Sequence, residues 1–242
     1  MKKFNNNFKV DILAFGAHPD DVECAVSGTL LKHIALGKTV AIVDLTVGEM
    51  GTYGTPEDRK KEASDAAKIL GISFREQLDF KDGAIENNEV NRIKIIESIR
   101  KYQPEIILSN AIDDRHPDHA NTAKLINDAN FLSGLVKIET FNADCKQEKW
   151  RSELVYNYIQ DYFIQPDFVV DITDYMDTKV ASILAYTSQF KNPKNPNPNS
   201  ITGLLDQIKS TNTIFGRRIN TAYAEGFTVN KYIGVQNLFD LS

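Results

Sequence analysis

Apolar runs that alternate with amphipathic segments constrain the fold of this chain more than any other feature of its sequence. Three apolar runs have the length and composition of buried strands: residues 10–15, 39–44 and 105–108. The more polar residues 75–79 fit a further strand. Apolar residues at helical spacing occupy the intervening segments, which are residues 21–37, 55–71, 90–102 and 117–129. This alternation predicts βαβ units and an α/β fold with a mainly parallel sheet.

Capping residues mark the ends of two predicted helices. Gly37 is suited to cap the C-terminus of the first helix. In the second, Thr55 is placed as the N-cap, Pro56 takes the first helical position, and Gly71 ends the helix.

The second half of the chain carries a weaker pattern. It predicts strands at residues 154–159 and 168–171 and helices at residues 175–186 and 201–215. Residues 192–200 contain three prolines and four asparagines, which predicts a loop. No repeat and no linker divides the chain, so we expect one domain over residues 1–242.

Charge and composition narrow the class of partner. A net charge of -5 without a long basic run argues against nucleic acid or an anionic membrane surface. The N-terminus lacks the apolar core of a signal peptide, and no apolar stretch approaches the roughly 20 residues of a spanning helix. Cys24 and Cys145 are too few for a disulfide framework. We therefore expect a cytoplasmic protein without membrane insertion.

Two clusters of histidine and aspartate follow predicted strands about a hundred residues apart. The first is Ala17-His18-Pro19-Asp20-Asp21, and the second is Arg115-His116-Pro117-Asp118-His119. Ligands of open α/β sheets bind beyond the carboxyl ends of the strands, so both clusters are expected at one site, at the ends of the first and fourth strands. A single His-Pro-Asp tripeptide is also common in turns, but two such clusters after strands favour function.

The residue types in these clusters fit a mononuclear metal site. His18, Asp21 and His119 supply two imidazoles and one carboxylate, which leaves a coordination position open, as in catalytic zinc sites. Zn²⁺ is the expected ion, although such ligands also accept iron, cobalt or manganese. Zinc lowers the pKa of a bound water toward ~7 and polarises a carbonyl group.

The remaining members of the clusters suit acid and base chemistry. Asp20 stands beside a ligand and is free to act as general base, and His116 suits the acid or an oxyanion stabiliser. Asp118 is placed to hold the His116 imidazole in one tautomer. Cys24 is better explained as a small buried thiol than as a ligand, and Arg115 as an ion-pair partner of a neighbouring aspartate.

Taken together, these motifs resemble the zinc-dependent LmbE-like (PIG-L-type) N-acetylglucosamine de-N-acetylases. The resemblance also rests on Leu45-Thr46-x-Gly48-Glu49, Arg59-x-x-Glu62-Ala63, Val170-Asp171-Ile172-Thr173, Tyr186-x-Ser188-Gln189 and Tyr223-Ala224-Glu225-Gly226-Phe227. The segment from Asp44 to Thr55 and the last of these motifs are similar to the bacillithiol-biosynthesis branch, whose members remove acetate from N-acetylglucosaminyl malate.

The resemblance implies a Rossmann-like three-layer fold, a small-molecule N-acetylglucosaminyl conjugate as substrate, and a homo-oligomer, since many members form one. It gives His18, Asp21 and His119 as zinc ligands, Asp20 as general base, and His116 as a protonated group facing the tetrahedral intermediate, oriented by Asp118. It further implies that Arg59, at the mouth of the site, contacts an anionic aglycone such as malate and that Glu49 contacts a sugar hydroxyl. Some relatives place a tyrosine where this chain has Asp114.

Other functions stay open on the sequence alone. The aglycone could instead be inositol, a second sugar or a lipid-linked group. The loops at residues 48–55, 131–151 and 192–200 would contact it. A metallophosphoesterase would need more ligands than these, and a non-catalytic sugar-binding module would not need Asp20 and His116. A dinucleotide oxidoreductase lacks support, because Phe15-Gly16-Ala17-His18 has no glycine fingerprint.

Overall fold

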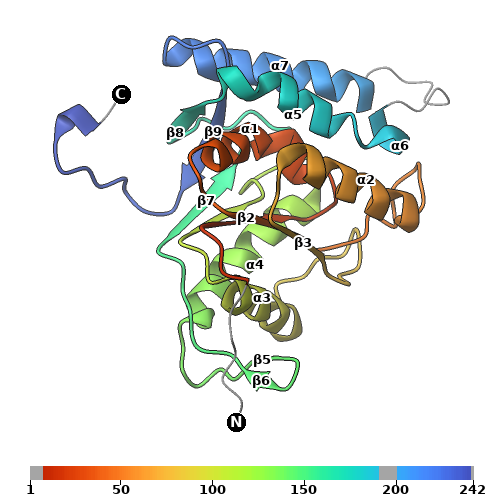
Figure 1. Ribbon diagram of the computed structural model, residues 1–242, viewed down its shortest axis with the longest axis vertical. Coiled ribbons are helices and arrows are strands. Elements are labelled where there is room, and N and C mark those ends of the chain that lie inside the picture. Colours follow the sequence, from red (N-terminus) through yellow and green to blue (C-terminus); the bar gives the residue numbers. More distant parts are fainter. Residues whose placement is uncertain (1–7, 191–200, 241–242) are drawn as a thin grey trace.

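A seven-stranded sheet forms the middle layer of the protein in a computed structural model, which describes residues 8–190 and 201–240 (Figure 1). The strand order is β3-β2-β1-β4-β7-β9-β8. The bounds are β1 Ile12–Gly16, β2 Val40–Asp44, β3 Phe74–Gln77, β4 Ile106–Ser109, β7 Leu154–Tyr158, β8 Phe168–Asp171 and β9 Ala224–Val229. The N-terminal residues 1–7 and the loop predicted at 192–200 lie outside the described residues.

Most neighbouring strands of this sheet are parallel. β3, β2, β1, β4 and β7 pair in parallel, whereas β9 runs antiparallel to both β7 and β8. The predicted α/β fold with a mainly parallel sheet is therefore confirmed. The antiparallel strand β9 was not predicted, and neither was the short hairpin of β5 Phe141–Asn142 and β6 Cys145–Lys146.

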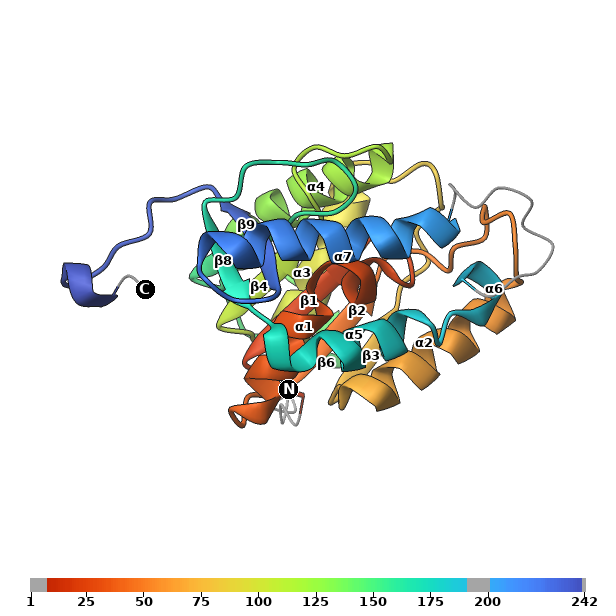
Figure 2. The ribbon, with the colours of Figure 1, turned by 90° about the horizontal axis from the view of Figure 1, so that it is seen from above.

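Helices cover both faces of the sheet and complete three layers (Figures 1 and 2). One face carries α3 Glu89–Tyr102 and α4 Pro117–Ser133. The other carries α1 Asp21–Ala35, α2 Pro56–Leu70, α5 Met176–Ile183, α6 Thr187–Phe190 and α7 Ile201–Arg218, with α7 lying across α1. Within residues 8–190 and 201–240, no helix is both long and apolar enough to cross a membrane.

The side chains of β1 show how a sheet covered on both faces shapes its sequence. Leu13 and Phe15 pack toward α3 and α4, whereas Ile12 and Ala14 pack toward α1. All four are at most 2% exposed, because successive side chains of a strand point to opposite faces and each face is covered. This explains why the strand is a continuous apolar run rather than an alternating one.

The predicted ends of α2 are confirmed by its capping geometry. The Thr55 hydroxyl accepts a hydrogen bond from the backbone N–H of Asp58, and the Asp58 carboxylate accepts one from the backbone N–H of Thr55. Gly71 closes the helix with a φ of 72°, a left-handed conformation that glycine adopts at little cost.

A buried ion pair joins β9 to the helical layer. The Lys179 ammonium lies 2.6 Å from the Glu225 carboxylate, and both side chains are 0% exposed. The same carboxylate accepts hydrogen bonds from the backbone N–H groups of Gly28 and Thr29 in α1. A side-chain carbon at Gly28 would lie 2.8 Å from Ile172, so only glycine permits this close approach. Glu225 thus ties three segments that are distant in the sequence.

We predict that Lys179→Met destabilises the protein by about 3–5 kcal/mol, because it leaves the buried Glu225 charge without its cation. Urea unfolding measures this loss. Adding Glu225→Gln to Lys179→Met removes the charge, so the double variant should recover part of it. Lys61, whose side chain is 80% exposed beside Asp65, is the matched control, and Lys61→Met should change stability by no more than about 0.5 kcal/mol. Equal effects at the two lysines would contradict this account.

Candidate active site

The carboxyl ends of β1, β4 and β7 bring the two predicted clusters to one edge of the sheet. The first cluster follows β1 directly, and Asp21 is the first residue of α1. The second follows the loop after β4, where His116 is the N-cap of α4. Both clusters line one cavity of about 780 Å³. The site therefore lies where the sequence placed it, beyond the first and fourth strands.

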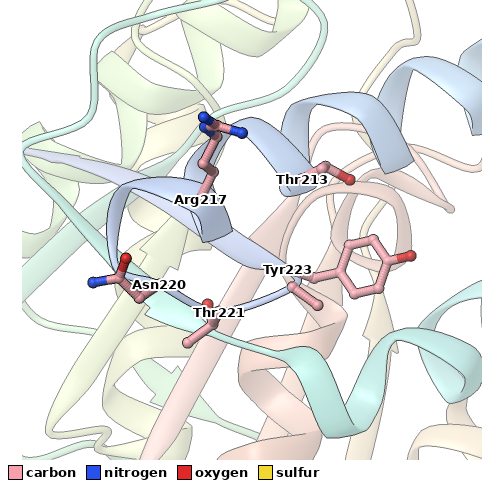
Figure 3. A pocket seen from close by; sticks show the side chains of 6 residues that line it. Thr213, Arg217, Asn220, Thr221 and Tyr223 are labelled. Atoms are coloured by element: carbon pink, nitrogen blue, oxygen red, sulfur yellow. The ribbon is translucent and has the colours of Figure 1, made fainter.

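Residues of two kinds line this cavity. One wall holds the charged and imidazole side chains of His18, Asp20, Asp21, Arg59, Asp82, Asp114, His116 and His119. Another holds apolar residues of α7, namely Leu204, Ile208 and Phe215. A separate depression of about 700 Å³ near the end of α7 contains none of the predicted site residues and is lined by Thr213, Arg217, Asn220, Thr221, Ala222 and Tyr223 (Figure 3).

The Asp21 carboxylate is the best-anchored group of the cavity. It accepts hydrogen bonds from the backbone N–H of His18 at 2.9 Å and from the side-chain amides of Asn110 at 3.0 Å and Gln160 at 3.2 Å. Burial raises the pKa of Asp21, but His119 and His18 outweigh this effect and hold it well below its usual value. Asp21 is therefore an ionised carboxylate in a fixed orientation, as a metal ligand requires.

His119 lies between two carboxylates. Its Nε2 is 3.1 Å from an oxygen of Asp21, and its Nδ1 is hydrogen-bonded to Asp114. Burial alone would lower the pKa of His119, but Asp21 and Asp114 raise it to about 9. The negative field that favours a proton on this imidazole favours any cation at its Nε2. Asp114 thus holds the His119 imidazole in the way that a carboxylate orients a metal-ligating histidine.

His18 has a similar arrangement, with a different set of partners. Its Nδ1 faces the Asp21 carboxylate at 3.6 Å, while its Nε2 lies 3.0 Å from Asp82 and 3.3 Å from Asp118. Burial lowers the pKa of His18, but the three carboxylates raise it well above the usual value. Asp118 also accepts hydrogen bonds from backbone N–H groups at residues 83 and 85. The Asp118 carboxylate is thus directed to His18 in this structure, and its predicted role in orienting His116 remains a prediction.

His116 is held by backbone rather than by a carboxylate. Its Nδ1 accepts a hydrogen bond from the backbone N–H of Asp118 at 3.2 Å, so the imidazole proton is assigned to Nε2. Burial lowers the pKa of His116, and the nearby His18 and His119 lower it further. The structure therefore presents an imidazole whose Nδ1 is occupied by the backbone, and the protonated state that the family resemblance implied for His116 remains a prediction.

Asp20 occupies a strained backbone position beside a buried arginine. Its φ of 108° lies in a region that favours glycine, and such strain persists only where the surroundings fix it. The Asp20 carboxylate is 3.1 Å from the Arg59 guanidinium, which also donates to the Pro19 carbonyl. Burial raises the pKa of Asp20 to about 7, although Arg59 pulls it down. Arg59 itself is 4% exposed and lines the same cavity, so it lies in the buried wall of the cavity and not at an open mouth.

Comparison with known proteins agrees with this geometry. The sequence profile of a family named PIG-L, described as GlcNAc-PI de-N-acetylase, matches residues 13–130. A crystal structure of the conserved protein TT1542 from Thermus thermophilus has a TM-score of 0.83 and 34% identity over 94% of this chain and 98% of that chain. The chain belongs to the PIG-L family.

Curated relatives of this PIG-L family member differ in the substrate that their names give. A diacetylchitobiose deacetylase from Thermococcus kodakarensis is 29% identical over 92% of this chain and 83% of its own length. A probable N-acetyl-alpha-D-glucosaminyl L-malate deacetylase 2 from Bacillus anthracis is 26% identical over 74% of this chain and 81% of its own length. The chain has a similar sequence identity to both relatives, so the comparison does not distinguish between their substrates.

The donor atoms of the cavity fit a divalent metal ion. Two groups of potential ligands lie with their donor atoms within 4.8 Å of one another: His18, His116 and His119, and His18, Asp82, His116 and Asp118. The Asp21 carboxylate lies between the imidazoles of His18 and His119, and a further carboxylate contacts each imidazole. Such a set of ligands suits zinc. Both groups include His116, which the sequence analysis kept outside the ligand set, so the ligand set His18, Asp21 and His119 remains a prediction.

The sequence analysis missed four residues of the site. It also predicted a substrate contact at Glu49, which does not line the cavity. Asn110 and Gln160 each follow an apolar strand. A polar residue after a buried strand is the pattern that identified His18, so the same pattern could have identified these two residues. Asp114 and Asp82 carried no comparable signal. Glu49 is not among the residues that line the cavity, because its carboxylate accepts a hydrogen bond from the backbone N–H of Asp82. The contact of Glu49 with a sugar hydroxyl therefore remains a prediction.

We predict that Asp114→Asn weakens zinc binding by about 10–100-fold, because it removes the carboxylate that braces His119. Competition with a chromophoric zinc chelator measures the dissociation constant. Asp113→Asn is the matched control, since Asp113 is exposed and adjacent, and its affinity should stay at the wild-type value. Equal affinity in all three proteins would show that Asp114 does not support a metal ligand.

Proposed function

We propose that this protein is a zinc-dependent hydrolase that removes the N-acetyl group from an N-acetylglucosaminyl conjugate. The observation that carries the proposal is the position of Asp20, a carboxylate outside the predicted ligand set that faces the same cavity as His18, Asp21 and His119. A purely sugar-binding site has no need for a strained, half-buried carboxylate beside its ligands. Hydrolysis of an amide does need one, because the attacking water must lose a proton.

We place the metal on His18, Asp21 and His119. When bound there, Zn²⁺ would supply Lewis acidity for the water and for the acetamide carbonyl, as iron, cobalt or manganese could also do. Asp118 and Asp82 hold the far nitrogen of His18, and Asp114 holds that of His119. Both imidazoles are thereby kept in fixed tautomers with one nitrogen directed to the cavity.

Asp20 and His116 are assigned complementary roles in the reaction. Asp20 takes the proton of the attacking water and returns it to the departing amine, so acetate and a free amino sugar leave. Arg59 holds the Asp20 carboxylate in place for both transfers. His116 donates its Nε2–H to the oxygen that becomes negatively charged as the water attacks, because Nδ1 is already occupied by the backbone.

The aglycone that we propose to test first is malate, on the strength of the resemblance to the bacillithiol branch. Arg59 lines the cavity and could share its guanidinium between Asp20 and a substrate carboxylate. Arg115 also lines the cavity, where it pairs with Asp161 rather than with Asp113 or Asp114. A second sugar, as in the substrate named for the Thermococcus relative, is the alternative.

Acetate release from a panel of conjugates tests the function. The purified, metal-analysed protein is incubated with N-acetylglucosaminyl malate, N,N'-diacetylchitobiose, N-acetylglucosaminyl inositol and N-acetylglucosamine, with and without chelator. We expect chelator-sensitive release, greatest from the malate conjugate. Greater release from another glycoside would keep the reaction and change the aglycone, whereas no release by zinc-loaded protein would leave the sugar-binding alternative.

We predict that Asp20→Asn lowers kcat by about 10²–10⁴-fold at unchanged zinc content and melting temperature, because the water loses its base. Asp113→Asn is the control, since Asp113 is exposed and lies outside the cavity lining. Its kcat and KM should match those of the wild type. Full activity of folded, zinc-loaded Asp20→Asn would exclude the proposed base.

A further inference from the structure

One side of the cavity is apolar and extends beyond the residues of α7. We define this apolar wall as Cys24, Ala25, Ile159, Leu204, Ile208 and Phe215, all of which line the cavity. Its three members from α7 follow helical spacing, so they share one face of that helix. A side-chain carbon at Gly226 would lie 2.7 Å from Phe215 and 3.1 Å from Ile159, so these two side chains meet over the backbone of β9.

The apolar wall begins beside the predicted metal site. Cys24 and Ala25 follow the predicted ligand Asp21 by three and four residues in α1, so they lie one turn away on the same face. On a second element, Ile159 is followed directly by Gln160, whose amide donates to the Asp21 carboxylate. The wall therefore starts close enough to the metal site to contact a group bonded directly to the reacting carbonyl carbon.

Hydrogen bonds hold the α7 part of the wall against the site. The Gln207 side-chain amide on α7 donates to both the carbonyl and the carboxylate of Asp161, at 2.7 Å each. The Asp161 backbone N–H donates in turn to Asp114, the carboxylate that braces His119. Figure 2 shows the resulting position of α7 across α1. The apolar face of α7 is thus a fixed part of the cavity.

A substrate of the proposed function has two unlike parts, one on each side of its amide. The nitrogen carries the sugar with its hydroxyl groups and any anionic aglycone, whereas the carbonyl carbon carries the apolar acyl chain. Arg59, Asp82 and Arg115 line the cavity and match the sugar and the aglycone in polarity. The apolar wall matches the acyl chain, because apolar groups gain free energy when they leave water together.

We infer that the apolar wall binds the N-acyl chain of the substrate and that the protein removes N-acyl groups longer than acetyl. This inference rests on the proposed hydrolase function and extends its substrate class. The chemistry is that of the acetyl substrate: water adds to the acyl carbon, the C–N bond breaks, and the acyl carboxylate and the free amine leave.

The extent of the wall is what points to longer chains. Leu204 and Phe215 lie three turns apart on α7, a span of about 16 Å along the helix. An acetyl group offers a single methyl group, which contacts only the part of the wall next to the metal site. A butanoyl or hexanoyl chain would cover more of the wall and remove more apolar area from water.

The test is the rate of amine release across a series of acyl chains. Full-length, zinc-loaded protein is incubated with glucosaminyl malate that carries an N-acetyl, N-propanoyl, N-butanoyl or N-hexanoyl group, and the free amino sugar common to all four reactions is measured. The same series is made on chitobiose if that glycoside releases more acetate. We expect kcat/KM to rise about two- to fourfold for each added methylene group, as partial or full burial of that group requires.

Variants of α7 test the wall itself through the ratio of kcat/KM for the hexanoyl and acetyl substrates, which does not depend on the fraction of folded protein. Ile208→Asn should lower this ratio by about tenfold, because the chain loses an apolar neighbour. Thr211→Val adds a methyl group on the same face and should raise it. The matched control is Ile214→Asn, since Ile214 is also on α7 but is 47% exposed and outside the cavity lining, and its ratio should equal that of the wild type.

The outcomes separate this inference from the proposed function. Release of acetate with kcat/KM falling as the chain lengthens, or an unchanged ratio in Ile208→Asn, would overturn the inference and leave the proposed function standing. No amine from any member of the series would overturn both. Faster deacetylation of octyl than of methyl N-acetylglucosaminide, without a gain along the acyl series, would assign the wall to the aglycone and also overturn the inference.

Discussion

The Asp21 carboxylate is the group on which the arrangement of the site depends. It begins α1 immediately after β1, and it is fixed by amides from Asn110 after β4 and Gln160 after β7. Three adjacent strand ends therefore converge on one carboxylate, and the order of the strands in the sheet determines which residues can meet there. His119 then reaches Asp21 from the start of α4, which brings the second cluster to the first.

The concentration of negative charge around two imidazoles gives the cavity its chemical character. Asp21, Asp82 and Asp118 surround His18, and Asp21 and Asp114 flank His119. Like charges so close together repel one another unless a cation lies among them. In this structure His18 and His119, whose pKa values are raised, supply this positive charge. A divalent ion could supply it instead, with both imidazoles neutral. The same concentration of negative charge explains why the Asp20 carboxylate is paired with the Arg59 guanidinium.

The sequence predicted what local chemistry determines and missed what tertiary contacts determine. Thr55 and Gly71 identified both ends of α2 because capping depends on neighbouring residues. The clusters around His18 and His116 were recognised because polar residues after buried strands meet at one sheet edge. Strand β9 was missed, since its pairing with β7 and β8 is long-range and its direction is reversed. The contact between Asp118 and His18 was also missed, because the two residues are a hundred positions apart and adjacency in the sequence pointed to His116.

The central claim is that one metal ion binds to His18, Asp21 and His119 and leaves Asp20 and His116 free to act on the substrate. An anomalous difference map at the zinc absorption edge, from crystals of the zinc-loaded protein, tests this claim most directly. The account predicts one peak per chain, about 2.0–2.1 Å from His18 Nδ1 and His119 Nε2 and bonded to an Asp21 oxygen. A peak bonded to His116 together with Asp82 or Asp118, or two peaks in one chain, would contradict it.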